Sequence, residues 1–244
     1  MKKNSFIDRY FHSEKELLDI REKEYRDINA LFSYLNNLHS TSEKLRDNFN
    51  CTLSKHPEFK VLRTLRNYFQ HVDDIDELRM YANLKNDMIL SHHELLVIPM
   101  QIWAEAVENF IQKNTVSKKR KDYKRKQSFI TKELDSILKI CDCVDILDNP
   151  SKFCRPLKLK CDNVIVELGF DIYKFVYNMS NIIADECRKI DELALKLKAL
   201  SIDSFYTSKN NIPKFNLNSH AADCNNIILT TRGYIHPKSI CPAI

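Results

Sequence analysis

Residues 57–72 read PEFKVLRTLRNYFQHV, a segment with the features of an amphipathic helix. Pro57 suits the first turn of a helix, where its missing N–H costs no hydrogen bond. Apolar side chains then recur at three- and four-residue steps, which gathers them on one helical face. They are Phe59, Leu62, Leu65 and Phe69. The stretch therefore predicts an amphipathic helix that buries this face in a core.

The same helical spacing continues on both sides of this stretch. Before it, a Ser13–Glu16 capping box predicts the start of a long helix to about residue 38, and Ser40–Ser42 predicts a break or a second cap. After it, the pattern predicts helices over 76–113, divided or kinked at Pro99, over 127–147 and over 162–200. The expected class is all-α, an up-and-down helical bundle with long helices and a small irregular C-terminal tail.

Glycine is scarce, which supports a helical fold. The chain has only two glycines among 244 residues, Gly169 and Gly233. Phosphate-binding loops and tight hairpins use glycine at positive φ, so nucleotide-binding α/β folds are not expected. We expect a helical domain over 1–204 and an irregular tail over 205–244, in which only 226–235 has the pattern of a strand.

The cysteine usage indicates a protein of a reducing compartment, and the charge is compatible with a polyanionic partner. The chain carries 38 basic and 33 acidic residues, and its net charge of +5 suits a polyanionic partner without requiring one. Its eight cysteines are scattered and contain no C-x-x-C, so reduced thiols are expected and a zinc site is only a minor alternative. With no signal peptide and no long apolar run, we expect a cytoplasmic protein without membrane, metal or cofactor.

The residues that best suit catalysis lie in the opening stretch. Asn67 and His71 are four residues apart and share one helical face, and the long side chain of Arg66 can reach over the same region. Histidine transfers protons near neutral pH, and arginine binds phosphate through paired hydrogen bonds. RNA supplies its own 2′-hydroxyl nucleophile, so this set predicts metal-independent phosphodiester chemistry. A solvated helix face is the alternative explanation.

The arrangement Arg66-Asn67-x-x-x-His71 resembles the signature of the HEPN superfamily, Arg followed after four to six residues by His. The resemblance covers about six residues and leaves 127–244 unexplained. It implies a helical, homodimeric endoribonuclease with Arg66, Asn67 and His71 as catalytic residues and a 2′,3′-cyclic phosphate product. It further implies a toxin or phage-defence role and an antitoxin or other regulatory partner.

A basic segment over 114–126 is a second candidate site for RNA. Its seven lysines and arginines suit phosphate neutralisation, and its one aromatic side chain suits base stacking. The expected RNA-binding residues are Lys118, Lys119, Arg120, Tyr123 and Arg125. A solubilising linker and a nuclear-localisation signal are the alternatives.

Other patterns are weaker candidates. Arg232 and His236 have one residue too few between them, His92-His93 could touch a metal, and Cys51 near His56 could form a thiol site.

Two further functions stay open for the whole chain. It could be a non-catalytic RNA- or nucleotide-binding protein, or a helical protein-interaction module that uses the stripe over 162–200.

Overall fold

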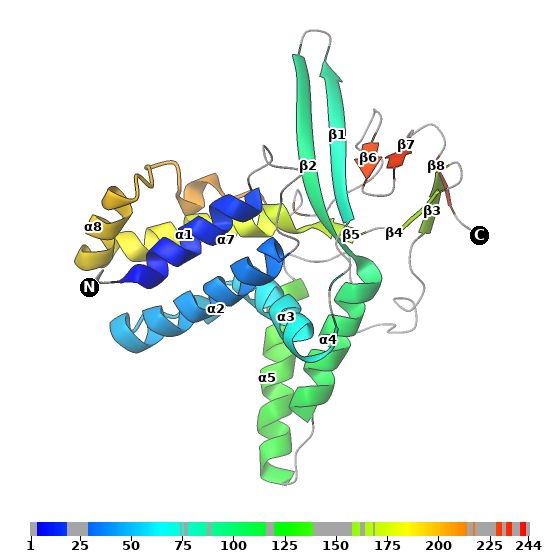
Figure 1. The fold of residues 1–244 in the computed structure, drawn as a ribbon. Helices are drawn as coiled ribbons and strands as arrows, with labels where there is room; N and C mark the ends of the chain where they lie inside the picture. Colours follow the sequence, from blue (N-terminus) through cyan, green and yellow to red (C-terminus); the bar gives the residue numbers. More distant parts are fainter. Residues whose placement is uncertain are drawn as a thin grey trace.

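A computed structural model places most of the chain and has a helical body with a projecting β-hairpin (Figure 1). The structure describes residues 4–18, 29–73, 75, 78–86, 89–115, 120–138, 158–161, 164–167, 169–213, 217, 228–230, 233–235 and 240–242. These residues form seven α-helices and eight short or long strands. The expected helical fold is confirmed, and two sheets are present that the all-α expectation did not include.

The first three helices are α1 (Ser5–Leu18), α2 (Ala30–Phe49) and α3 (Pro57–His71). The expected helix start at Ser13 is wrong, because Ser13 lies inside α1 and its hydroxyl donates to the carbonyl of Tyr10 at 2.9 Å. The expected break at Ser40–Ser42 is also wrong, since α2 continues to Phe49 and ends with Asn50 in the left-handed conformation. The predicted helix α3 is confirmed, with Pro57 in its first turn.

Four more helices complete the helical body. They are α4 (Met100–Thr115), α5 (Arg120–Leu138), α7 (Ile172–Arg188) and α8 (Asp191–Ala199). Short 3-10 turns, η1 (Leu53–Lys55) and η2 (Ser208–Asn210), lie before α3 and after α8. Helix α5 begins seven residues before the expected residue 127, and the expected residues 139–147 of that helix lie outside the described part of the chain.

The helix expected over 76–113 is wrong in its first half. A hairpin of β1 (Leu78–Asn86) and β2 (Ile89–Pro99) occupies this stretch, with Leu78 opposite Val97 and Asn86 opposite Ile89. Leu96 and Ile98 are both buried, so this run alternates with the period of a strand. Pro99 does divide the segment as predicted, because it ends β2 immediately before α4.

The single helix expected over 162–200 is also wrong. Strand β4 (Val164–Glu167) and strand β5 (Gly169–Asp171) precede α7. The β-branched run Val164-Ile165-Val166 favours a strand. Asp171 then caps α7 by accepting from the backbone N–H of Tyr173 at 3.1 Å, which starts the helix ten residues later than expected.

The remaining strands are β3 (Lys158–Cys161), β6 (Ile228–Thr230), β7 (Gly233–Ile235) and β8 (Ile240–Pro242). One sheet has the order β5-β2-β1-β6-β7 and the other β4-β3-β8. The stretch 226–235, predicted as one strand, contains the two short antiparallel strands β6 and β7, and β8 is a further strand of the tail that was not predicted.

Helix α7 lies at the centre of the core. Its apolar side chains with no exposed surface are Ile172, Phe175, Val176, Met179, Ile183, Ala184 and Cys187. Helix α3 is buried on several sides, since it contacts α2 through Arg66, α4 through Tyr68 and α5 through Arg63. No helix in the described part of the chain is long and apolar enough to cross a membrane.

Candidate functional site

The candidate motif occupies the last turns of α3. The apolar face of this helix is buried as expected at Leu62 and Leu65, both with no exposed surface. Arg66 and Asn67 are half-buried, and His71 is exposed as the last residue of the helix. The position of His71 at a helix end leaves its imidazole accessible to a ligand.

Arg66 is directed towards α2 and towards its own neighbour. Its Nε donates to Oδ1 of Asn36 at 3.2 Å, and one of its terminal nitrogens donates to Oδ1 of Asn67 at 3.4 Å. Gln70 donates to the same Asn36 oxygen at 2.9 Å. Partial burial lowers the pKa of Arg66, although a guanidinium remains charged at physiological pH. Asn36 therefore fixes the position of the motif arginine from the neighbouring helix.

A second histidine lies close to this arginine. Burial lowers the pKa of His39 on α2, and the charge of Arg66 lowers it further. The Nε2 of His39 lies 3.5 Å from a carboxylate oxygen of Glu43. An imidazole with a lowered pKa is neutral near pH 7, so it can accept a proton.

Asn67 and His71 line one cavity between the end of α3 and the facing side of α4. The cavity has a volume of about 540 Å³. From α4 it is lined by Ala106, Asn109, Phe110, Lys113 and Asn114. The structure therefore brings Asn67 and His71 together, and it links Arg66 to them through the bond to Asn67.

Tyr68 holds α4 against this end of α3. Its side chain is 5% exposed, and its hydroxyl donates to a carboxylate oxygen of Glu105 on α4 at 2.7 Å. Burial raises the pKa of Tyr68 to about 12, and the bond to Glu105 adds to this shift, so the phenol stays protonated as a donor. This bond sets the separation of the two cavity walls.

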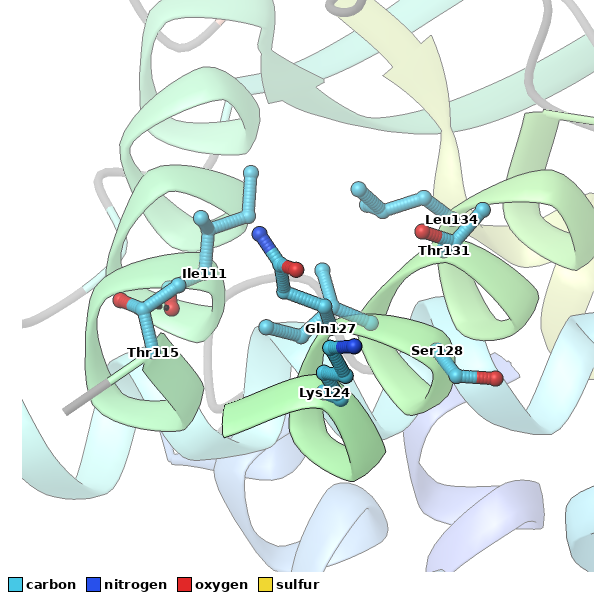
Figure 2. Close-up of a pocket in the computed structure, with 8 residues that line it drawn as sticks. Ile111, Thr115, Lys124, Gln127, Ser128, Thr131 and Leu134 are labelled. Atoms are coloured by element: carbon cyan, nitrogen blue, oxygen red, sulfur yellow. Dashed lines mark hydrogen bonds between the residues drawn. The ribbon is translucent and has the colours of Figure 1, made fainter. Parts of the chain in front are cut away.

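A second cavity of about 560 Å³ lies between α4 and α5. Figure 2 shows Ile111 and Thr115 of α4 on one side, and Lys124, Gln127 and Leu134 of α5 on the other. It shares no lining residue with the cavity at the end of α3.

The predicted RNA-binding segment is only partly described. Lys118 and Lys119 lie outside the described residues, and Arg120 and Tyr123 lie on α5 with side chains that the structure does not describe. Arg125 is exposed on the same helix. The part of the segment from Arg120 onwards begins α5.

The structure adds no support to the weaker candidate sites of the sequence analysis. Burial raises the pKa of the Cys51 thiol, and Glu186, to which that thiol donates at 3.5 Å, raises it further, which disfavours the reactive thiolate. His92 and His93 lie on β2, with side chains that the structure does not describe. Arg232 and His236 lie outside the described residues. Within the part of the chain that the structure describes, no group of three acidic, His or Cys side chains is placed to hold a metal ion.

Several residues of this site were not found from the sequence. Asn36 and His39 come from α2, and Asn109, Lys113 and Asn114 come from α4. The chain matches no family model, no curated protein and no solved structure.

Proposed function

We propose that this chain is a metal-independent endoribonuclease of the HEPN type that uses Arg66, Asn67 and His71. One observation supports this most strongly. Asn67 and His71 line the same cavity, and Arg66 donates to Asn67 at 3.4 Å. The three side chains of the motif therefore belong to one connected polar site.

The proposed reaction is an internal transesterification of RNA. The 2′-oxygen bonds to the neighbouring phosphorus while the bond from phosphorus to the 5′-oxygen breaks. His71 takes the proton of the 2′-hydroxyl or gives a proton to the leaving 5′-oxygen. Arg66 stabilises the additional negative charge at phosphorus, and Asn67 orients the attacking hydroxyl. The products are a 2′,3′-cyclic phosphate and a 5′-hydroxyl.

The resemblance of the motif extends this proposal to a homodimer. A second copy of the chain would bring a second His71, so that one imidazole acts as base and the other as acid. The same resemblance favours a toxin or phage-defence role, restrained by a regulatory protein. Such an activity would stop cell growth when the chain is expressed alone, whereas the His71→Ala variant would be tolerated.

The test is RNA cleavage in the presence of EDTA. The purified chain is expected to cut single-stranded RNA, and His71→Ala is expected to lose about 100-fold or more of the rate. His12→Ala is the matched control, because His12 lies on α1 with 72% of its side chain exposed. RNA that stays intact with the unaltered chain would refute the proposal.

RNA binding without cleavage is the second candidate function. It is favoured by the bonds of Arg66 to Asn36 and Asn67, which engage the guanidinium within the protein. In that case Arg66→Ala weakens RNA binding, His71→Ala leaves binding unchanged, and neither protein cuts RNA.

A further inference from the structure

One face of α4 forms the second wall of the cavity at the end of α3. The lining residues Ala106, Asn109, Phe110, Lys113 and Asn114 are spaced three and four apart, which is the spacing of a single helical face. Figure 1 shows α4 beside α3 in the same part of the molecule. This wall contains no residue of the sequence motif, so its chemistry is independent of the motif.

The chemistry of the complete lining suits a nucleotide. It comprises three amides, one imidazole, one lysine and one phenyl ring, and it includes no carboxylate. Amides donate to and accept from base edges, and a lysine neutralises a phosphate. The volume of about 540 Å³ falls within the range of about 300–1,000 Å³ that small-ligand sites span. A base can enter such a cavity only after it leaves its stack.

Two polar side chains of the α4 wall, those of Asn109 and Lys113, are available to a ligand. Two other amides of the lining are already engaged within the protein, since Asn67 on α3 accepts from Arg66 and Asn114 donates to the carbonyl of Phe110 at 2.7 Å. By contrast, the described residues provide no hydrogen bond to the Asn109 amide and no ion pair for Lys113. These two residues are four apart and therefore lie one above the other on the cavity wall.

Because Asn109 and Lys113 face His71 across this cavity, we propose that they form the nucleotide-holding half of the site. Lys113 contacts a phosphate next to the one that is cut, and Asn109 contacts the edge of the adjoining unpaired base. This assignment rests on the proposed ribonuclease function and names the residues that position its substrate. Asn109 is thereby a base-selecting residue, and Lys113 a residue that holds the backbone of any sequence.

The experiment separates the two roles. Binding of a labelled single-stranded RNA is measured on the His71→Ala background at several salt concentrations, and cleavage sites are mapped on the background with His71 intact. Lys113→Gln is expected to weaken binding to all sequences alike and to reduce the slope of log affinity against log salt by about 0.7. Asn109→Ala is expected to change the preference among bases at the cut site by about 10-fold and to leave the salt slope unchanged.

Two matched controls distinguish these effects from general damage. Lys198→Gln removes an exposed charge on α8, and Asn48→Ala removes an exposed amide on α2, about three turns beyond Asn36. Both controls are expected to behave as the unaltered chain.

If Lys113→Gln and Asn109→Ala also behave as the unaltered chain while RNA is bound and cut, the inference is wrong and the proposed function stands. If RNA is never cut but Lys113→Gln weakens its binding, the proposed function fails, and of the inference only the phosphate contact of Lys113 stands. If RNA is not bound at all, both fail.

Discussion

A buried ion pair fixes α5 against α3, and its disruption should cost a large part of the stability of the fold. Lys60 Nζ of α3 lies 3.1 Å from Oε1 of Glu133 on α5, and both side chains are only 10% exposed. Arg63 of α3 pairs with the other carboxylate oxygen of Glu133 and is 22% exposed. The replacement Glu133→Leu keeps a side chain of similar size but leaves the ammonium group of Lys60 buried without its partner.

The magnitude follows from this burial. Removal of one member of a buried ion pair costs about 3–5 kcal/mol, because the remaining charge stays out of water. Domains of ordinary stability have about 5–15 kcal/mol in total, so Glu133→Leu should lose about a fifth or more of it. Arg63 adds less to the cost, since its guanidinium is partly solvated and also lies 5.6 Å from the ring centre of Phe59.

Urea unfolding measures this cost, and a double variant tests its cause. Glu133→Leu should lower the free energy of unfolding by about 3 kcal/mol with an unchanged dependence on urea. The double variant Lys60→Met, Glu133→Leu removes both charges and should recover at least half of that loss. A loss below about 1 kcal/mol in the single variant, or a double variant no more stable than the single one, would show that the unpaired Lys60 charge carries no large cost.

Three further predictions concern single side chains. Tyr68→Phe removes the bond to Glu105 and should lower the free energy of unfolding in urea by about 1 kcal/mol, with a higher KM for RNA; unchanged values of both would contradict its role between the cavity walls. Asn36→Ala frees Arg66 and should slow RNA cleavage by as much as about 100-fold without unfolding the chain, and a rate equal to that of the unaltered chain would contradict this. Burial raises the pKa of Glu14 from 4.5 to about 7, so the folded chain binds this proton more tightly than the unfolded chain. Its stability should therefore fall as pH rises from about 5 to about 8, by about 3 kcal/mol more than in Glu14→Gln, and equal urea-derived slopes against pH would contradict this.

The sequence predicts α3 well because its signals agree. Pro57 begins the helix, and Leu62 and Leu65 hold one buried face up to His71. The hairpin over 78–99 was not predicted, because short apolar runs fit both the 3.6-residue period of a helix and the two-residue period of a strand. Leu95 and Ile98 are three apart as in a helix, whereas Leu96 and Ile98 alternate as in a strand, and the packing decides for the strand. The stripe over 162–200 contains the same ambiguity where β4 and β5 precede α7.

The motif residues of the site lie close together in the sequence, whereas the other residues of the site come from a different helix. Asn67 and His71 share a face because of helical geometry alone, so their spacing predicts their shared cavity. Asn109 and Lys113 join them only because Tyr68 and Glu105 hold α4 beside α3, which is tertiary packing. A local signal for the α4 wall exists, because Asn109 and Lys113 are four apart and share one face of the helix. This spacing indicates a ligand site only when Asn67 and His71 are known to form the opposite wall.

RNA with a single 2′-deoxy nucleotide at a mapped cut site tests the proposed transesterification at its attacking atom. In the proposed reaction the 2′-oxygen attacks, His71 transfers the proton and no metal ion takes part in the step. We therefore predict that in EDTA the all-ribose strand is cut to a 2′,3′-cyclic phosphate and that the deoxy-substituted bond stays intact. Cleavage of the deoxy-substituted bond, or a linear 3′-hydroxyl or 5′-phosphate product, would exclude attack by the 2′-oxygen.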